Sequence, residues 1–171
     1  HYAYQLKQLI GHYRNSWHGE SWGAVSDGFP VYFTQLPSWT PPQSNPVEGV
    51  ESPWVVSRES MWRVSRELYN TGMAVTIDTG DTISLHPKNK KPIGERHAYL
   101  ALGKTYGMRS VHEGPVFSGY KIEGNRIRLN FTSTGSGLMG SREKALDAFA
   151  LSADNRFWYW AEAKIEGDSI I

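Results

Sequence analysis

Met73-Ala-Val-Thr-Ile-Asp78-Thr-Gly-Asp81-Thr-Ile-Ser-Leu-His86-Pro-Lys-Asn-Lys90 is the stretch of this sequence that decides the predicted fold. Residues 73–77 form a short apolar run, which predicts a strand buried on both faces, as in a parallel sheet. Two carboxylates, a glycine, a histidine and a proline follow it at once. Open parallel sheets carry their chemistry beyond the carboxyl ends of their strands, so this segment is the first candidate site.

His86 is the residue in this segment best placed for chemistry. It follows the predicted buried strand and precedes Pro87, which restrains it to an extended geometry. A histidine in such a place can act as a general base if an acid a few residues earlier orients it. Asp81 and Asp78 compete for that role.

Other uses of the same residues stay open. His86 could instead brace the loop between strand and helix, and Asp-Thr-Gly-Asp is a good turn sequence in its own right. The two carboxylates and the histidine could together hold a cation, but no further ligand nearby completes such a site. A general base with an acidic partner is therefore one of three interpretations that the residues allow.

Helical and strand patterns alternate through the first 112 residues. Ser52-Pro53 is the clearest helix start, because serine can cap a helix and proline at the first helical position loses no needed N–H. Gly107 suits a helix C-terminal cap. The order helix, strand, helix, strand, helix is typical of right-handed crossovers on a parallel sheet. The predicted elements are a helix from the start to about Trp17, a strand at 29–36, a helix at 52–68, a strand at 73–77 and a helix at 92–107.

Residues 113–171 predict a β-rich antiparallel region. Tyr120 and Ile122 alternate with polar residues, Gly124-Asn125 suits a two-residue hairpin turn, and the alternation resumes at Ile127. Two further strands are predicted at 144–151 and 156–165 around a Ser-Ala-Asp-Asn turn. We therefore expect two parts, residues 1–112 and residues 113–171.

Composition excludes several classes of function. The chain has 18 Lys and Arg against 17 Asp and Glu, a net charge of +1, which gives no electrostatic case for binding nucleic acid or an anionic membrane. It has no cysteine, so disulfides, thiol nucleophiles and thiolate metal sites are excluded together. No apolar stretch approaches the roughly 20 residues that span a bilayer. Seven tryptophans and nine tyrosines suit sugar stacking, although core packing accounts for them as well.

Two other motifs have the composition of catalytic loops. Trp17-His-Gly-Glu-Ser21 brings histidine, glutamate and serine together, but it follows a helix instead of a strand, which favours a surface loop. Gly135-Ser-Gly137 lies in the β-rich region and lacks the helix start that a phosphate cradle needs. Neither motif displaces the segment around His86 as the candidate site.

The segment quoted first resembles the late block of the sialate O-acetylesterases, a family of SGNH-type carbohydrate esterases that remove acetyl groups from sialic acid. The matching residues there are 70–78, Gly80-Asp81 and His86-Pro-Lys-Asn-Lys90. Further family landmarks follow in order: Tyr13-Arg14, Trp17, residues 29–33, Gln35-Leu36, Trp54, Arg58-Glu59, residues 104–107, 114–116, 135–138 and 160–168.

This resemblance implies part of a three-layer α/β/α hydrolase domain of the flavodoxin-like type in residues 1–112, with a parallel sheet, followed by the β-rich region. It implies hydrolysis of acetyl esters on sialic acid, of the 9-O-acetyl type, through a serine acyl-enzyme and without a cofactor. His86 lies at the family's catalytic histidine. The compartment expected for such an enzyme is secreted, periplasmic or lysosomal.

The sequence departs from the family pattern in two ways. The serine and the Gly-Glu-Ser-Asn oxyanion block have no counterpart here, so the nucleophile is expected on an N-terminal segment or on another chain. This agrees with a chain that starts inside a predicted helix and ends inside a predicted hairpin, as a processed or excised piece would. Ile83 and Ser84 occupy the positions where relatives carry the acid, which leaves Asp81 as the partner of His86, with Asp78 or no acid as alternatives.

Two other functions remain as alternatives. One is a non-catalytic carbohydrate-binding or structural module, which the missing nucleophile and the aromatic β-rich region favour. The other is an acetyl xylan esterase of similar mechanism, since related esterases differ mainly in their loops.

Overall fold

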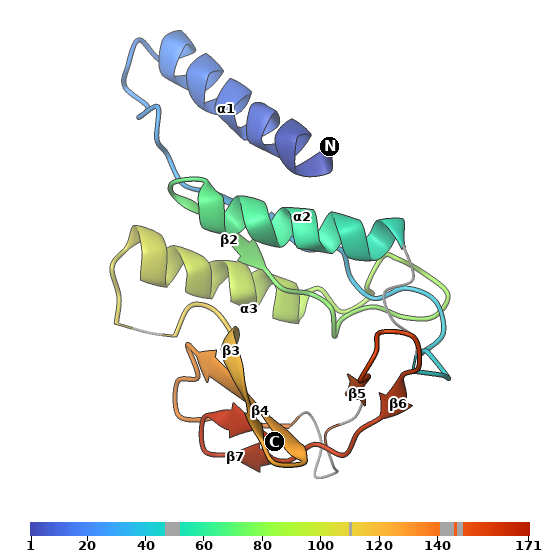
Figure 1. Cartoon of the computed structure of the whole chain (residues 1–171). Coiled ribbons are helices and arrows are strands. Elements are labelled where there is room, and N and C mark those ends of the chain that lie inside the picture. The colour runs from blue at the N-terminus through green and yellow to red at the C-terminus, as the bar shows by residue number, and fades with distance from the viewer. Residues whose placement is uncertain (47–51, 110, 141–145, 147–148) are drawn as a thin grey trace. The chain divides into compact units, whose positions relative to one another are not determined.

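The computed structural model describes residues 1–46, 52–109, 111–140, 146 and 149–171 (Figure 1). Within these residues the chain forms two compact units. The first is made of residues 1–41 and 52–112, and the second of residues 42–46 and 113–171. No helix in the described part of the chain is long and apolar enough to cross a membrane.

The first unit alternates helices and strands in the predicted order. Its two strands pair in parallel, with Val31 opposite Thr71 and Thr34 opposite Ala74. The mixed α/β class with a parallel sheet, as predicted, is confirmed. The elements are α1 (Tyr2–Glu20), β1 (Val31–Thr34), α2 (Pro53–Glu67), β2 (Thr71–Ala74), α3 (Lys91–Leu100) and the π-helical turn η1 (Ala101–Thr105).

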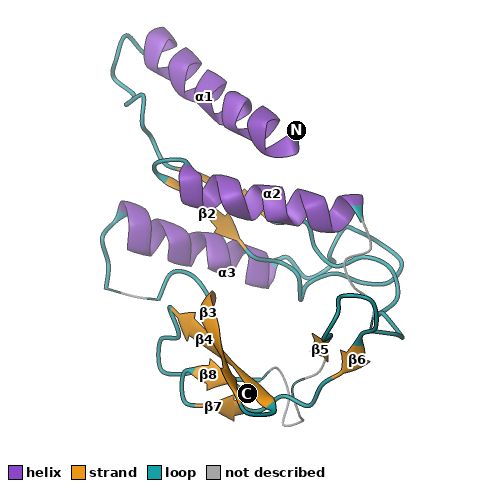
Figure 2. Ribbon diagram, in the orientation of Figure 1, coloured by secondary structure: helices purple, strands orange, loops and turns teal. Residues whose placement is uncertain are grey.

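Helices cover both faces of this small sheet (Figure 2). Thr71 donates a hydrogen bond from Oγ1 to the carbonyl oxygen of Leu68 at the end of α2, 2.7 Å away. The next residue, Gly72, faces α3, because a Cβ there would press on Leu100. Since successive strand residues point to opposite faces, α2 and α3 lie on opposite sides of β2. The buried apolar residues of the unit lie in these elements: Ile10, Met61, Val64, Met73, Ala74 and Leu100.

The strand predicted at 73–77 is shorter than expected and only partly buried. Met73, Ala74 and Thr76 are buried, but Val75 and Ile77 are 42% and 52% exposed. The prediction of burial on both faces is therefore wrong for these two residues. The physical reason is that pairing with β1 ends at Ala74, so Val75 and Ile77 lie beyond the paired strand.

Helix ends also differ from the predictions in detail. Ser52 lies at the N-cap of α2, and its carbonyl accepts the first hydrogen bond of the helix from the N–H of Val56 at 3.0 Å, but its hydroxyl makes no capping bond. The helix predicted to reach Gly107 becomes π-helical at Ala101. Gly107 then has φ of 66°, the left-handed conformation expected of a C-terminal glycine.

The outer edges of β1 and β2 have different neighbours. Side chains of α3 and η1 bind the outer edge of β2, where Lys104 Nζ donates to the Thr71 carbonyl at 2.9 Å and Arg96 Nη1 donates to the Val75 carbonyl at 2.7 Å. Charged side chains on an edge strand prevent further strand pairing. On β1, no second strand pairs along the outer edge within the described residues.

The second unit is antiparallel, as predicted. β3 (Val116–Glu123) and β4 (Arg126–Thr132) form the expected hairpin, with Gly124 at φ of 65°. They continue through β8 (Ser169–Ile170) to β7 (Ile165–Glu166), and β5 (Ala150–Leu151) pairs separately with β6 (Tyr159–Trp160).

Of the strands predicted at 144–151 and 156–165, the described residues form only short pairs. Asp154 Oδ1 accepts the backbone N–H groups of Arg156 and Phe157, so these two residues belong to a capped turn and do not extend the strand. Residues 144, 145, 147 and 148 of the first predicted strand lie outside the described residues.

Gly80 allows the segments that follow β1 and β2 to touch. A Cβ at Gly80 would overlap the backbone carbonyl of Ser38. We expect Gly80→Ala to lower the free energy of unfolding by about 1–3 kcal/mol, the usual cost of forcing extra volume into a packed site. Chemical denaturation followed by far-UV circular dichroism measures it.

Gly94→Ala in α3 is the matched control for this prediction. A Cβ at Gly94 meets nothing within 4 Å, so the same substitution there should stabilise the helix by about 0.5–1 kcal/mol. Equal effects at Gly80 and Gly94 would show that the contact with Ser38 does not matter.

Candidate active site

The segments that follow β1 and β2 leave the sheet at the same edge, because the two strands are parallel. Hydrogen bonds join them: Ser38 Oγ donates to the Ile77 carbonyl at 2.5 Å. Trp39 forms an isolated parallel bridge with Asp81, and its indole N–H points to the Ile83 carbonyl at 3.4 Å. The candidate segment around His86 is thus held against the end of the neighbouring strand.

His86 extends from this segment toward solvent. Its side chain is exposed, whereas the next residue, Pro87, is buried. The backbone N–H of His86 donates to Ser84 Oγ at 3.1 Å. The imidazole has no hydrogen-bond partner among the described residues, and the carboxylates of Asp81 and Asp78 bind other groups. An anchored backbone with a free imidazole suits a group that acts on a substrate or on another segment.

Asp81 shapes the turn that leads to His86. Its Oδ1 accepts the backbone N–H of Ile83 at 2.6 Å and that of Ser84 at 2.9 Å. These two hydrogen bonds lower the pKa of Asp81. The carboxylate is therefore ionised at neutral pH, as an acid that supports a histidine must be.

Asp78 has a different partner. Both of its oxygens bind Arg96 of α3, with Nη1 to Oδ1 and Nη2 to Oδ2 each at 2.6 Å. The hydrogen bond from Arg96 is the main cause of the lowered pKa of Asp78. An imidazole that used Asp78 would have to share its oxygens with the guanidinium. This carboxylate links α3 to the end of β2 instead.

Two residues of α3 were not singled out by the sequence: Arg96 and His97. His97 Nε2 lies 2.8 Å from Thr34 Oγ1 at the end of β1, and burial lowers the pKa of the imidazole. Both side chains tie α3 to the carboxyl edge of the sheet. The sequence signal was weak, since they are two neighbouring polar residues in a predicted helix without a motif.

The other candidates have local roles. Ser21 Oγ donates to the His18 carbonyl and accepts the N–H of Val25, so the hydroxyl closes the end of α1. Gly135 and Gly137 have φ of 62° and 123° in a turn. Within the part of the chain that the structure describes, no group of three His, Asp or Glu side chains could hold a metal ion.

The Asp78–Arg96 pair makes stability depend on pH. The folded-state pKa of Asp78 is lowered, so its contribution is present above the unfolded value of about 3.9 and is lost as pH falls through the folded value. Because Asp78 is 58% exposed, we expect Asp78→Asn to cost at most about 1 kcal/mol at pH 7. Urea denaturation at pH 7 and near pH 2.5 should show this difference closing in acid.

A double-mutant cycle with Arg96→Gln separates the pair from other effects of each residue. If the ion pair matters, the loss in Asp78→Asn/Arg96→Gln is smaller than the sum of the two single losses. Additive losses at pH 7 would contradict this account.

The chain is similar to known carbohydrate esterases. No family model matches it. A sialate O-acetylesterase from Mus musculus is 27% identical over 136 residues, which cover 77% of this chain and 25% of the mouse protein.

The crystal structure of a carbohydrate acetylesterase from Xanthomonas citri superimposes with a TM-score of 0.79 and 29% identity. It covers 99% of this chain, which spans 37% of that protein. The chain thus spans about a quarter of the curated relative and little more than a third of the solved one. These similarities confirm the resemblance predicted from the sequence and relate the chain to carbohydrate esterases of the sialate O-acetylesterase type.

Proposed function

We propose that this chain supplies the histidine-bearing part of a carbohydrate O-acetylesterase site. His86 is the residue on which the proposal rests. It is exposed and is followed by the buried Pro87, in the segment beyond the carboxyl edge of a parallel sheet. The chain is also related to carbohydrate acetylesterases. The serine nucleophile belongs to a segment or chain outside these 171 residues.

In the proposed reaction His86 is the general base. It takes the proton of the serine hydroxyl as the serine oxygen bonds to the acetyl carbonyl carbon, and it returns that proton to the sugar oxygen as the ester bond breaks. Water then attacks the acetyl-serine ester, with His86 again taking a proton and giving it to the departing serine oxygen. The products are acetate and the free sugar hydroxyl.

Asp81 is the proposed acidic partner. It is ionised, and its carboxylate shapes the turn that leads to His86. Asp78 is less suitable, since both of its oxygens bind Arg96. The negative charge of Asp81 would stabilise the imidazolium that forms during catalysis.

The outer edge of β1 offers a place for the segment that carries the serine. The N–H groups of Val31 and Gln35 donate to the carbonyls of Asn70 and Ala74, so the intervening Tyr32 and Thr34 direct their backbone groups to the other edge. No described strand pairs there, and such an edge is a template for another strand. Leu9 and Tyr13 of α1 are 46% and 49% exposed, as expected of a helix that packs on a further strand.

The proposed substrate is a sugar acetyl ester, of the 9-O-acetyl sialic acid type. The name of the mouse relative supports sialic acid, and acetylated xylan is the alternative. Trp39 is 44% exposed, forms a bridge with Asp81 and has a tilted ring contact with Trp54 at 5.6 Å. Its exposed part is the proposed packing surface for the sugar ring. An enzyme acting on such glycans belongs in a secreted, periplasmic or lysosomal compartment.

A second candidate function is carbohydrate binding without catalysis. It is favoured by the aromatic residues on β3, where Phe117 is 54% and Tyr120 65% exposed. Titration of the chain with sialosides and xylo-oligosaccharides, followed by NMR, tests it. Shifts confined to β3 residues would support this function, and shifts at Trp39 would support the esterase instead.

The chain alone should release no acetate from O-acetylated sugars, because the proposed site lacks its nucleophile. Acetate release by the purified chain, measured with an enzyme-coupled acetate assay, would place the nucleophile within these residues and contradict this part of the proposal.

A chimera tests the role of His86. We expect activity when this chain replaces the matched part of the Xanthomonas citri acetylesterase, since 99% of the chain superimposes on it. His86→Ala should then lower kcat by about 100-fold to 10,000-fold, the range typical of lost general-base catalysis. His18→Ala, at an exposed position in the last turn of α1, is the control and should have little effect. Unchanged acetate release in the His86→Ala chimera would sink the assignment.

The same chimera distinguishes the two acids. Asp81→Asn keeps an oxygen to accept the N–H groups of Ile83 and Ser84 but loses the charge, so the turn should survive while kcat falls. Asp78→Asn should affect stability more than kcat. A large loss of kcat in Asp78→Asn alone would reverse the assignment.

A further inference from the structure

Arg58 of α2 reaches across to the segment that follows β1. Its Nε donates to the Leu36 carbonyl at 2.9 Å, and its Nη2 donates to the Pro37 carbonyl at 2.6 Å. The same Nη2 lies 3.4 Å from Ser38 Oγ. One rigid guanidinium therefore contacts three consecutive residues and fixes their direction as they leave the sheet.

A tryptophan of the same helix acts on the same segment. Trp54 Nε1 donates to the Pro37 carbonyl at 2.7 Å, so this oxygen accepts hydrogen bonds from both Trp54 and Arg58. The Trp54 ring also packs on Trp39, with the ring centres 5.6 Å apart. Residues 36–39 are thus positioned by α2.

The positioned segment in turn holds the segment that follows β2. Ser38 Oγ donates to the Ile77 carbonyl, and the Ser38 carbonyl lies where a side chain at Gly80 would be. Trp39 bridges to Asp81 and points its indole N–H to the Ile83 carbonyl. All of these contacts join residues 38–39, which follow β1, to residues 77–83, which follow β2.

Hydrogen bonds continue from Asp81 to His86. Asp81 Oδ1 accepts the N–H groups of Ile83 and Ser84, and Ser84 Oγ accepts the N–H of His86. A connected series of contacts therefore leads from the guanidinium on α2 to the backbone of the candidate histidine.

We propose that Arg58 is a positioning residue for His86, acting through residues 36–39 and 77–84. The proposal rests on the function proposed for His86, but the placement of the loop is measured without catalysis. Arg58 touches neither His86 nor a reacting group. A lysine keeps the charge but has no planar fork, so Arg58→Lys should restore the placement only in part.

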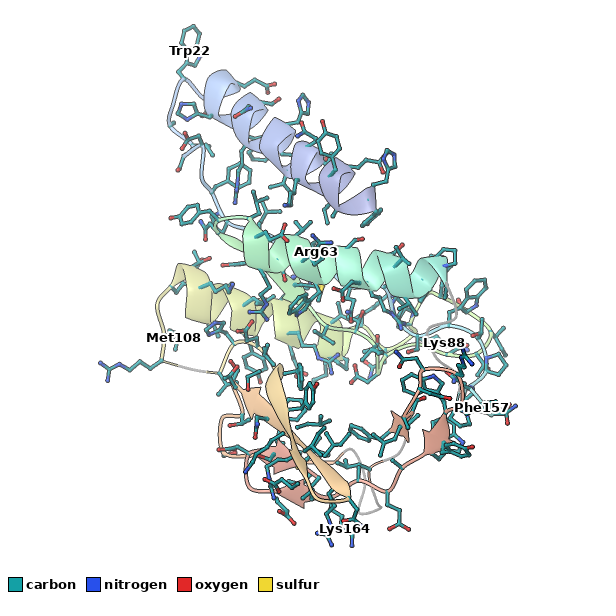
Figure 3. All side chains as sticks on the ribbon, in the orientation of Figure 1. Trp22, Arg63, Lys88, Met108, Phe157 and Lys164 are labelled. Atoms are coloured by element: carbon teal, nitrogen blue, oxygen red, sulfur yellow. The ribbon has the colours of Figure 1, made fainter. Side chains whose placement is uncertain are left out.

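NMR of the ¹⁵N-labelled chain tests the placement directly. We expect Arg58→Gln to shift the amide signals of Ile83, Ser84 and His86 and to raise the solvent exchange of the first two about tenfold or more, while the buried amides of Val64 and Met73 keep their protection. Arg63→Gln is the control: Arg63, labelled on α2 in Figure 3, is 58% exposed and pairs with Glu67. It should leave the loop signals unchanged.

Ser38→Ala is a milder variant in case Arg58→Gln unfolds the chain. It removes only the hydroxyl that Arg58 contacts and that donates to Ile77, and it should move the same loop signals in the same direction. Unchanged signals at residues 81–86 in both variants would overturn the proposal. So would an equal loss of protection at Val64 and Met73, which would mean general destabilisation.

In the chimera, Arg58→Gln should lower kcat with KM nearly unchanged, and Arg58→Lys should recover part of the loss. A change in KM alone would contradict a positioning role. If His86→Ala leaves the chimera fully active, the proposed function is wrong. The NMR measurement still tests the placement of the loop, because it does not depend on activity.

Discussion

The parallel pairing of β1 with β2 is the constraint on which the rest of the first unit depends. Only four residue pairs make it, from Val31 opposite Thr71 to Thr34 opposite Ala74. Because the strands run in the same direction, the segments that follow them emerge side by side. Ser38 can meet Gly80, and Trp39 can meet Asp81, only for that reason. The geometry around His86 is thus a consequence of strand direction.

So short a sheet is held by cations that bind backbone carbonyls. Arg14 donates to the carbonyls of Phe29 and Asn70 at the start of the strands, and Arg58 binds Leu36 and Pro37 beyond the end of β1. Lys104 and Arg96 bind carbonyls along β2. Charge-assisted hydrogen bonds of this kind are about twice as strong as neutral ones. These hydrogen bonds hold the amino and carboxyl ends of the two strands in place, while His86 stays exposed.

The sequence predicted what local patterns control. The order of helices and strands, the hairpin at Gly124 and the cap at Gly107 follow from periodicity and glycine chemistry, and the structure contains all of them. It could not predict that the chain becomes exposed just after β2, because burial of Val75 and Ile77 depends on what lies beside them. Nor could it pair Asp78 with Arg96 or Arg58 with Leu36, since these partners lie 18 and 22 residues apart and no motif links them. The catalytic roles of His86 and Asp81 remain predictions from the sequence, and the structure defines the loop in which the two residues lie.

The most direct test of the central claim, that His86 activates a serine nucleophile, is the rate at which the acetyl-enzyme forms. Rapid quenching of the chimera with an acetyl ester, followed by intact-protein mass spectrometry, measures this step separately from turnover. Our account predicts an acetylated serine that forms within the first turnover and that is nearly absent when His86 is replaced by alanine. Acetylation at an unchanged rate in the His86→Ala chimera would contradict it.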